Sequence, residues 1–234
     1  MKDGHLNPIT STIREISTIF SEIGFSVAQG PELEDEFHNF DALNIPRDHP
    51  ARDMQDTFWV KNPKGDKNLV LRTHTSSVQI RFMEAMSKDP KPFKIIIPGK
   101  VYRNEATDIT HEAQFNQIEG LYVNKNVSMT ELKGTLDYFF KKLLGPDTKI
   151  RFRSSFFSFV EPGVEVDVWH NGKWLEVMGA GVVHPNVISA CGLDPKVWKG
   201  FAFGGGVDRL AIIKYGVDDV RNFYTGDLRV INQF

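Results

Sequence analysis

The order of the candidate strands is the feature that most constrains the fold. Segments 93–102 and 115–123 are separated only by a polar loop, and segments 150–159, 164–169 and 174–183 follow one another closely. Parallel neighbours need a long crossover, usually a helix, so this order favours antiparallel pairing. We predict an α+β fold with a mainly antiparallel sheet flanked by helices, and not a doubly wound parallel sheet.

Helices are expected where apolar residues recur at intervals of three and four. Asn7-Pro8 reads as an N-cap followed by proline in the first turn, and Gly24 fits the end of that helix. Segments 75–86, 128–144 and 206–215 are the other expected helices. Shorter strands are expected at 25–28 and 200–203, with a hairpin formed by 57–60 and 69–72.

Length and composition limit the classes of protein further. With 234 residues and a formal net charge of −2, the chain can form one sizeable core or two small domains but lacks the basic surplus of a general nucleic-acid binder. Cys191 is its one cysteine, which excludes an internal disulfide and a cysteine-based zinc site. The apolar stretches are short and no apolar signal region follows Met1, so we expect a cytoplasmic protein.

Arg103 and Glu105 stand at the end of an expected strand, ahead of a polar loop. Two residues apart on a strand, their side chains point to the same face. The guanidinium fork suits phosphate oxygens, and the loop could fold over a nucleotide. In isolation, an exposed salt bridge is the commoner explanation of such a pair.

A run of three glycines, Gly204 to Gly206, stands between the last expected strand and the last long helix. Glycine lets a ligand approach the backbone closely, and a helix start offers amide donors and a favourable dipole to an anion. Arg209 would lie about one turn into that helix and could face the same ligand. A tight turn with a solvated arginine explains the run equally well, and the full dinucleotide-binding fingerprint is missing.

Two further segments could contribute to a pocket. Residues 72–79 gather polar groups at the start of a helix, although a single histidine such as His74 is more often structural than catalytic there. Phe157 and Phe159 would share one face of a strand, so both rings could wall an aromatic pocket. Ordinary core packing is the commoner explanation of such a pair.

Together these segments resemble a known family. Arg103-x-Glu105 and Gly204-x-Gly206-x-x-Arg209 resemble motifs 2 and 3 of class II aminoacyl-tRNA synthetases, and residues 10–46, with Gly30-Pro31-Glu32, resemble the motif 1 region. Four strings are similar to the bacterial-type alpha chain of phenylalanine–tRNA ligase: Asn39-Phe40-Asp41-Ala42-Leu43-Asn44-Ile45-Pro46, His49-Pro50-Ala51-Arg52-Asp53, Leu71-Arg72-Thr73-His74-Thr75-Ser76 and Phe159-Val160-Glu161-Pro162-Gly163. The resemblance runs from about Gly4 to Phe234. It implies one catalytic domain over residues 1–234, with the motifs at about 7–46, 95–123 and 200–215.

The sequence also departs from the family pattern. Asn7 stands where the family usually has histidine, Ser158 where it has proline, and Asp208 where glutamate is common. The family's alpha chains usually begin with a long helical arm that helps to hold tRNA, and this sequence begins after it. We therefore expect weak tRNA binding by the chain alone and a need for a beta subunit in efficient charging.

The resemblance implies ATP-dependent activation of L-phenylalanine. The phenylalanine carboxylate attacks the α-phosphate of ATP, pyrophosphate leaves, and the aminoacyl group passes from the adenylate to a terminal ribose hydroxyl of tRNA(Phe). Arg103 and Arg209 would be the catalytic residues, the first at the α-phosphate and substrate carboxylate, the second at the γ-phosphate and the adenine face. Catalysis would consist of positioning and electrostatic stabilisation.

The resemblance also implies the binding residues. ATP would contact Arg103, Glu105, His111, Phe115, Gly204, Gly206 and Arg209. Phenylalanine would contact His74, Thr75, Ser76, Gln79, Gln117, Glu119, Phe157, Phe159, Ala202 and Gly204. Mg²⁺ would bind Glu161 near the interface with the beta subunit, and further ions could bridge the ATP phosphates.

Two other classes of function stay open at this point. One is a non-catalytic paralogue that acts by binding; such proteins tend to lose the ATP arginines, whereas Arg103 and Arg209 are both present. The other is an adenylate-forming ligase that does not use tRNA, against which the paired phenylalanines favour phenylalanine as substrate. The expected partners are ATP, phenylalanine, tRNA(Phe), the beta subunit and a second copy of this chain through the motif 1 region, with no membrane.

Overall fold

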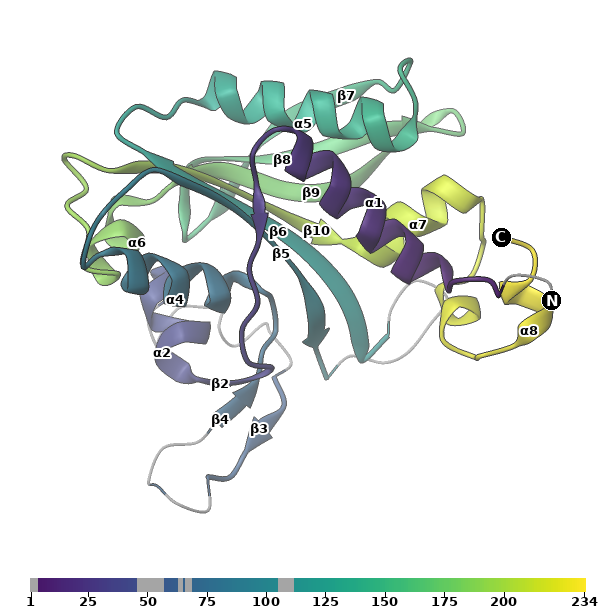
Figure 1. Ribbon diagram of the computed structural model, residues 1–234, viewed down its shortest axis with the longest axis horizontal. Coiled ribbons are helices and arrows are strands. Elements are labelled where there is room, and N and C mark those ends of the chain that lie inside the picture. Colours follow the sequence, from purple (N-terminus) through teal and green to yellow (C-terminus); the bar gives the residue numbers. More distant parts are fainter. Residues whose placement is uncertain (1–3, 46–56, 63–64, 66–68, 105–111) are drawn as a thin grey trace.

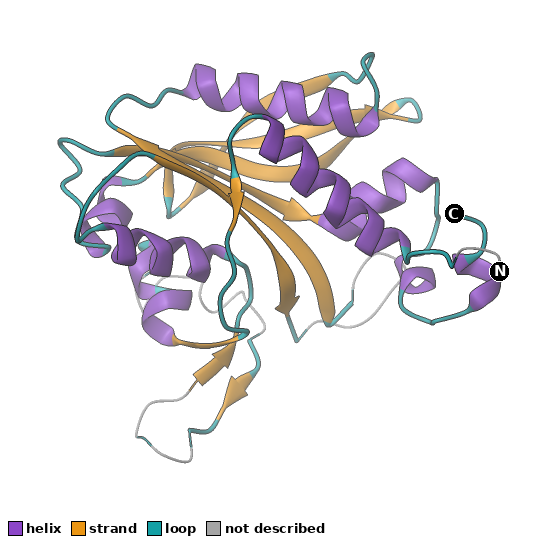
Figure 2. Ribbon diagram, viewed as in Figure 1, coloured by secondary structure: helices purple, strands orange, loops and turns teal. Residues whose placement is uncertain are grey.

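A seven-stranded sheet forms the centre of the molecule in the computed structural model, which describes residues 4–45, 57–62, 65, 69–104 and 112–234 (Figure 2). In spatial order its strands are β1 (Ser26–Val27), β5 (Phe93–Tyr102), β6 (Gln114–Asn124), β10 (Lys199–Gly206), β9 (Lys173–Val183), β8 (Val160–His170) and β7 (Ile150–Phe157). Every neighbouring pair is antiparallel except β1 and β5. The predicted α+β class with a mainly antiparallel sheet is confirmed.

Three long helices cover one face of this sheet (Figure 1). They are α1 (Pro8–Glu22), α5 (Met129–Leu144) and α7 (Val207–Tyr215). Phe20 of α1 is fully buried and stacks on Phe139 of α5 and Phe203 of β10, with ring centroids 4.8 and 5.1 Å apart. These aromatic contacts join the helical layer to the middle of the sheet.

The opposite face of the sheet is covered at one end only. There a second apolar cluster includes Ile95, Ile97 and Leu121, which alternate along their strands with residues that face the long helices. The elements around this cluster are α2 (Glu36–Asn39), the 3-10 helix η1 (Asp41–Leu43), α4 (Ser76–Met86) and α6 (Pro185–Ala190). Beside them lies a small antiparallel sheet of β2 (Leu33–Asp35), β4 (Leu69–Leu71) and β3 (Trp59–Val60).

Local sequence signals explain most of the helix boundaries. The side chain of Asn7 accepts the N–H of Ile9 at 2.9 Å, with Pro8 at the first helical position, as predicted. Ser128 and Glu131 form a reciprocal capping box at the start of α5. Three short helices were not predicted, although each has a local start signal: α6 begins at Pro185, and Asp219 and Asp227 cap the 3-10 helix η2 (Val220–Phe223) and α8 (Leu228–Ile231). None of the described helices combines the length and apolarity needed to cross a bilayer.

Two local predictions were wrong. The glycine run forms no strand-to-helix turn, because β10 extends to Gly206 and α7 begins at Val207. These glycines serve close packing instead: a Cβ at Gly204 would lie 2.6 Å from Cγ of Glu119, and one at Gly205 would lie 2.2 Å from the carbonyl oxygen of Val177. Phe159, expected on the same strand as Phe157, lies in the turn between β7 and β8.

Replacing the central ring should destabilise the whole fold. Phe20→Ala removes a fully buried side chain between two stacked neighbours, so the free energy of unfolding should fall by about 3–5 kcal/mol in urea titrations. Phe156→Ala is the matched control because Phe156 is 78 % exposed, and its effect should stay within about 0.5 kcal/mol. Equal losses in the two variants would contradict this packing.

Candidate active site

Two adjoining cavities lie on the open part of the sheet. The first has a volume of about 260 Å³ and the second about 360 Å³. The residues that line both cavities mark the junction between them: Arg103, Gln117, Glu176, Gly179 and Gly204. They come from the end of β5 and from β6, β9 and β10, so the central strands of the sheet bring the two cavities together.

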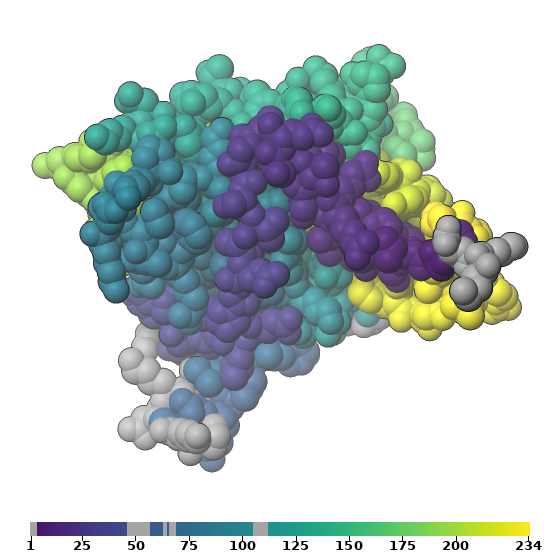
Figure 3. Space-filling model, viewed as in Figure 1, coloured from purple at the N-terminus to yellow at the C-terminus, as the bar shows by residue number. Residues whose placement is uncertain are grey.

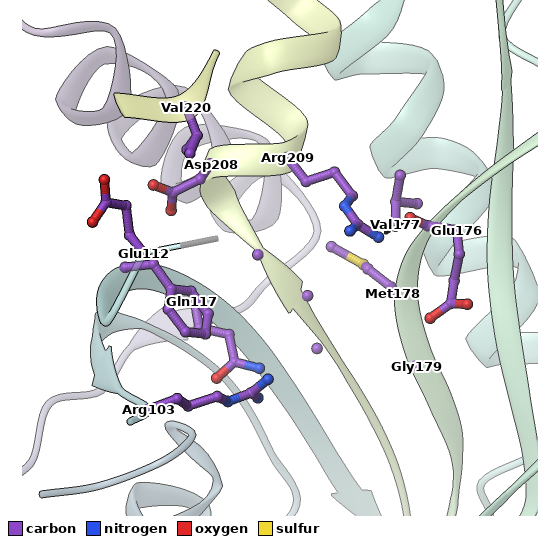
Figure 4. Close-up of a pocket in the computed structure, with 14 residues that line it drawn as sticks. Arg103, Glu112, Gln117, Glu176, Val177, Met178, Gly179, Asp208, Arg209 and Val220 are labelled. Atoms are coloured by element: carbon purple, nitrogen blue, oxygen red, sulfur yellow. Dashed lines mark hydrogen bonds between the residues drawn. The ribbon is translucent and has the colours of Figure 1, made fainter. Parts of the chain in front are cut away.

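The first cavity has two arginines and an aromatic ring. Arg103 follows β5, and its guanidinium carbon lies 5.1 Å from the ring centroid of Phe115 on β6. Its Nε donates to the carbonyl oxygen of Thr73 at 3.3 Å. Arg209 reaches across from α7 and donates to the backbone oxygen of Glu176 at 2.8 Å. Figure 4 shows Arg103 and Arg209 approaching the cavity from different sides of β10, whose glycines form its floor.

The second cavity has an apolar end and a polar end. Phe157 and Phe159 stack with their ring centroids 5.7 Å apart, and Ala202, which is 8 % exposed, lines the same cavity. Gly179 makes room for this pair, because a Cβ there would lie 3.0 Å from the ring of Phe157. The polar end consists of His74, Ser76, Gln79, Arg103, Gln117 and Glu119. A ligand with an aromatic ring and a charged head would match this division.

Glu119 is the buried carboxylate of the polar end, 4 % exposed. One of its oxygens accepts the N–H of Thr75 at 3.1 Å, and the other accepts Oγ of Ser76 at 2.6 Å and Nε2 of Gln79 at 2.7 Å. Burial raises the pKa of this carboxyl, and the three donors oppose that shift. All three donors are neutral, and together they hold the carboxyl group in place.

Thr75, predicted to contact phenylalanine, is not among the residues that line the second cavity. Its N–H binds Glu119, its Oγ1 donates to the carbonyl oxygen of Ile97 at 3.2 Å, and it is fully buried behind the second cavity. Thr75 is the N-cap of α4, so its N–H has no acceptor within the helix, and Glu119 is that acceptor. Thr75 therefore positions Glu119 and does not line the cavity.

His74 is neutral and lines the second cavity. Burial, followed by the charge of Arg103, lowers its pKa from 6.5 to about 4. Its Nε2 lies 3.0 Å from the carbonyl oxygen of Asn39, which can only accept, so Nε2 carries the proton. Within the described part of the chain, Nδ1 of His74 and Oε1 of Gln117 are buried without a partner. Both suit a ligand that donates hydrogen bonds.

Glu161, the residue predicted to bind Mg²⁺ near the interface with the beta subunit, lies outside the two cavities. Its side chain is 78 % exposed, 3.6 Å from Nε2 of His184, in a neighbouring cavity that shares only Phe157 and Val160 with the second one. The geometry does not bring it to the ATP or phenylalanine residues. Glu105 and His111 fall outside the described residues.

Several lining residues were missed by sequence reasoning. Glu176 lines both cavities, and its pKa is raised by burial and by the neighbouring Glu165. Nothing in the sequence sets it apart from the other acidic residues of the β8–β9 hairpin. Asp208 was noted only as a departure from the family pattern, and Val220 follows the last predicted helix. Leu43 and Val187 line the second cavity from η1 and α6.

One group of potential metal ligands lies elsewhere. Glu34, Asp35 and His38 are the one such group of three in the described part of the chain. Arg81 already binds Glu34 through two hydrogen bonds of 2.8 and 2.5 Å, and His38 bridges Asp35 and Glu84 at 2.7 and 2.9 Å. These bonds join β2 and α2 to α4, which is a structural role.

Comparison with known proteins places this chain in a family. The model of the tRNA synthetase class II core domain (F) matches residues 1–234. The phenylalanine–tRNA ligase alpha subunit of Proteus mirabilis is 54 % identical over 235 residues, which cover 100 % of this chain and 69 % of that protein. The chain belongs to the phenylalanine–tRNA ligase alpha subunits, within the class II tRNA synthetases. The predicted family is confirmed.

Relatives from other bacteria agree with this placement. The phenylalanine–tRNA ligase alpha subunit of Dehalococcoides mccartyi is 49 % identical over 245 residues, which cover 99 % of this chain and 70 % of that protein. The one from Bacillus mycoides is 50 % identical over 246 residues, covering 100 % and 70 %. Similarity over nearly the whole chain disfavours the two alternative classes, a non-catalytic paralogue and a ligase that does not use tRNA.

The protonation state of His74 can be checked through the pH dependence of stability. Its pKa falls from 6.5 to about 4 on folding, so between these values the unfolded state binds a proton that the folded state does not. The free energy of unfolding should therefore fall by about 3 kcal/mol as the pH drops across this window, and should not change from this cause above it. Urea titrations at several pH values should show a smaller decline for His74→Gln. His5→Gln, at an exposed histidine, should keep the wild-type decline; an unchanged decline in His74→Gln would contradict the assignment.

Proposed function

We propose that the two adjoining cavities form one active site in which this chain activates L-phenylalanine with ATP and passes it to tRNA(Phe). Arg103 at the junction is the observation that carries the proposal. The first step joins a carboxylate to an α-phosphate, so the amino-acid site and the nucleotide site must meet at one cation. Arg103 lines both cavities and offers a planar fork of donors to both groups.

The second cavity takes phenylalanine. The substrate ring lies against Phe157, Phe159 and Ala202, and its ammonium group donates to Glu119, with Oε1 of Gln117 and Nδ1 of His74 as further acceptors. Ser76 and Gln79 hold Glu119 in position. The carboxylate of the substrate then faces Arg103. A pocket walled by rings rejects tyrosine because the buried hydroxyl would lack a partner.

The first cavity takes ATP. Phe115 offers one face to adenine, and Arg209 stacks on the other face or binds the γ-phosphate. Arg103 lies over the ring of Phe115 in this structure, so we expect it to move from that ring toward the α-phosphate when the nucleotide binds. Gly204 and Gly206 leave the strand surface open to the substrates. Glu105 and His111 stay predictions, at the adenine amino group and the outer phosphates.

Carboxylates at the site fit Mg²⁺, which is usually held by one or two carboxylates together with phosphates and water. Glu176 lines both cavities beside Arg209 and is half-exposed, so it could share an ion with the ATP phosphates. Glu161, the predicted ligand, offers a single exposed carboxylate near His184 and would need further ligands from a partner. The ion supplies charge neutralisation of the leaving pyrophosphate.

No covalent nucleophile is required. Arg103 and Arg209 place positive charge where negative charge develops on the phosphates, and the glycine-lined floor keeps the two substrates in contact. The substrate carboxylate oxygen attacks the α-phosphorus as pyrophosphate leaves. A terminal ribose hydroxyl of tRNA(Phe) then attacks the carbonyl carbon of the adenylate, releasing AMP.

Residues 1–234 are proposed to act as one catalytic domain that works with a beta subunit. The relatives are named alpha subunits, and the net charge of −2 supports weak tRNA binding by this chain alone. A second copy would meet the motif 1 region, where α1 exposes Thr10, Arg14 and Thr18. Apolar contact there would come from Val27 and Leu33, which are 50 % and 41 % exposed.

The activation step should depend on Arg103. In phenylalanine-dependent ATP–pyrophosphate exchange, measured with and without added beta subunit, Arg103→Ala should lower the rate by about 10²-fold or more, because a lost transition-state donor typically has that effect. Arg229→Ala is the matched control, because this arginine of α8 is 90 % exposed and lines neither cavity, and it should exchange at the wild-type rate. Wild-type exchange by Arg103→Ala would refute the role of this residue.

The size of the amino-acid pocket should depend on Ala202. Ala202→Gly removes the methyl group opposite the phenylalanine pair, so para-chlorophenylalanine should gain roughly ten-fold in kcat/KM relative to phenylalanine. Ala28→Gly is a suitable control, because Ala28 is equally buried at 8 % exposure but does not line the cavity. If para-chlorophenylalanine stays as poor a substrate as before, Ala202 does not limit the pocket.

A further inference from the structure

The chain segment after α7 forms part of the wall of the first cavity. Val220 of η2 lines the cavity and is 2 % exposed. The segment is held from outside by Asn7, the N-cap of α1, whose Nδ2 donates to the carbonyl oxygen of Phe223 at 2.8 Å. Figure 3 shows these C-terminal residues packed beside the start of α1. The nucleotide cavity therefore includes residues beyond the last synthetase motif.

Tyr224, the next residue of this segment, joins a closed network with Asp208 and Asn116. Its hydroxyl donates to Oδ1 of Asp208 and accepts from Nδ2 of Asn116 at 3.0 Å. Oδ2 of Asp208 accepts the backbone N–H of Asn116 at 2.9 Å. Each of the three residues is bonded to the other two, and they come from the C-terminal segment, α7 and β6. A fully satisfied polar network of this kind restricts the positions of its members.

The network lies where backbone pairing ends. The ladder between β6 and β10 stops at Gln117 and Gly206, and α7 then turns away from β6. One residue further along β6, the side chain of Asp208 replaces the missing strand partner of Asn116. In Figure 4, Asp208 lies on the side of α7 toward Glu112 and Val220, while Arg209 points the opposite way, toward β9. Tyr224 thus fixes the spacing between α7 and the start of β6.

That spacing sets the distance between the two groups proposed to hold ATP. Phe115 directly precedes Asn116, and Arg209 directly follows Asp208. We propose that Tyr224 is a positioning residue for the nucleotide: through Asp208 and Asn116 it holds Arg209 and Phe115 at the separation that ATP requires. The inference rests on the proposed ATP site and adds to it a residue outside the three motifs.

Electrostatics support a role for the hydroxyl group in particular. Asp208 is 6 % exposed, and burial raises the pKa of its carboxyl. The hydrogen bonds from Tyr224 and from the N–H of Asn116 lower it, whereas the charge of Glu112 raises it further. Arg103 and Arg209 are the cations that line the same cavity. Without the hydroxyl of Tyr224, Asp208 should take up a proton at a higher pH.

Tyr224→Phe tests the proposal because it removes one oxygen and keeps the ring. In ATP–pyrophosphate exchange by the chain assembled with its beta subunit, the KM for ATP should rise about ten-fold, since a hydrogen bond to a charged group is lost. The KM for phenylalanine should stay at the wild-type value, and the rise for ATP should grow as the pH is lowered. Isothermal titration of ATP alone should show the same loss of affinity.

Tyr138→Phe is the matched control. Its hydroxyl also donates to a carboxylate, Oε2 of Glu22 at 2.5 Å, but on the exposed side of the helical layer, so both KM values should stay unchanged. Asn116→Ala removes a second bond of the network and should raise the KM for ATP in the same way. If Tyr224→Phe does not fold, Asn116→Ala still tests the proposed role of the network.

An unchanged affinity for ATP in the folded Tyr224→Phe or Asn116→Ala protein would overturn the proposal, as would a parallel rise in both KM values. The wild-type protein separates this outcome from a failure of the proposed function. Absence of phenylalanine-dependent exchange in the wild type would refute the function, while the titration of ATP would still decide the role of Tyr224.

Discussion

The burial of Glu119 is the constraint on which the arrangement of the site depends. A carboxylate in a protein interior is unfavourable unless hydrogen bonds compensate it, and here the backbone of Thr75 and the side chains of Ser76 and Gln79 do so. These donors tie the start of α4 to the middle of β6. Opposite Glu119 on β10 only glycine fits, because a Cβ at Gly204 would lie 2.6 Å from the glutamate side chain. One charged group thus sets the local sequence of three segments.

The sheet places the two cavities next to each other. Helices cover one face, and on the other face the central strands bring Arg103, Gln117 and Gly204 to the junction of the two cavities. The same carboxylate that α4 stabilises is the proposed counter-ion of the phenylalanine ammonium group, so binding the substrate completes a network that the fold prepares. Separate elements then adjust each end: the β7–β8 turn supplies the aromatic wall, and the C-terminal segment closes the nucleotide side through Tyr224.

Local sequence patterns predicted the structure within single segments. They did not predict the contacts between segments that are distant in the sequence. Strand order gave the antiparallel sheet, and Asn7-Pro8 gave the start of α1, because capping is a local interaction. Resemblance grouped Arg103, Phe115, Glu119 and Ala202, and the structure brings these residues to the two cavities. The hydrogen bond from the N–H of Thr75 to Glu119 joins two distant segments, and no local pattern indicated it. The role of Asp208 depends on Tyr224 and Asn116, which no spacing in the sequence connects with it.

A crystal structure with a non-hydrolysable analogue of phenylalanyl-adenylate is the most direct test of a single active site shared by the two cavities. The account predicts the phenyl ring beside Phe157 and Phe159 and the ammonium group on Glu119. It also predicts the adenine on Phe115 and the guanidinium of Arg103, moved off that ring, at the bridging group that replaces the α-phosphate. An analogue bound with its ring outside the second cavity, or with Arg103 still stacked on Phe115, would contradict it.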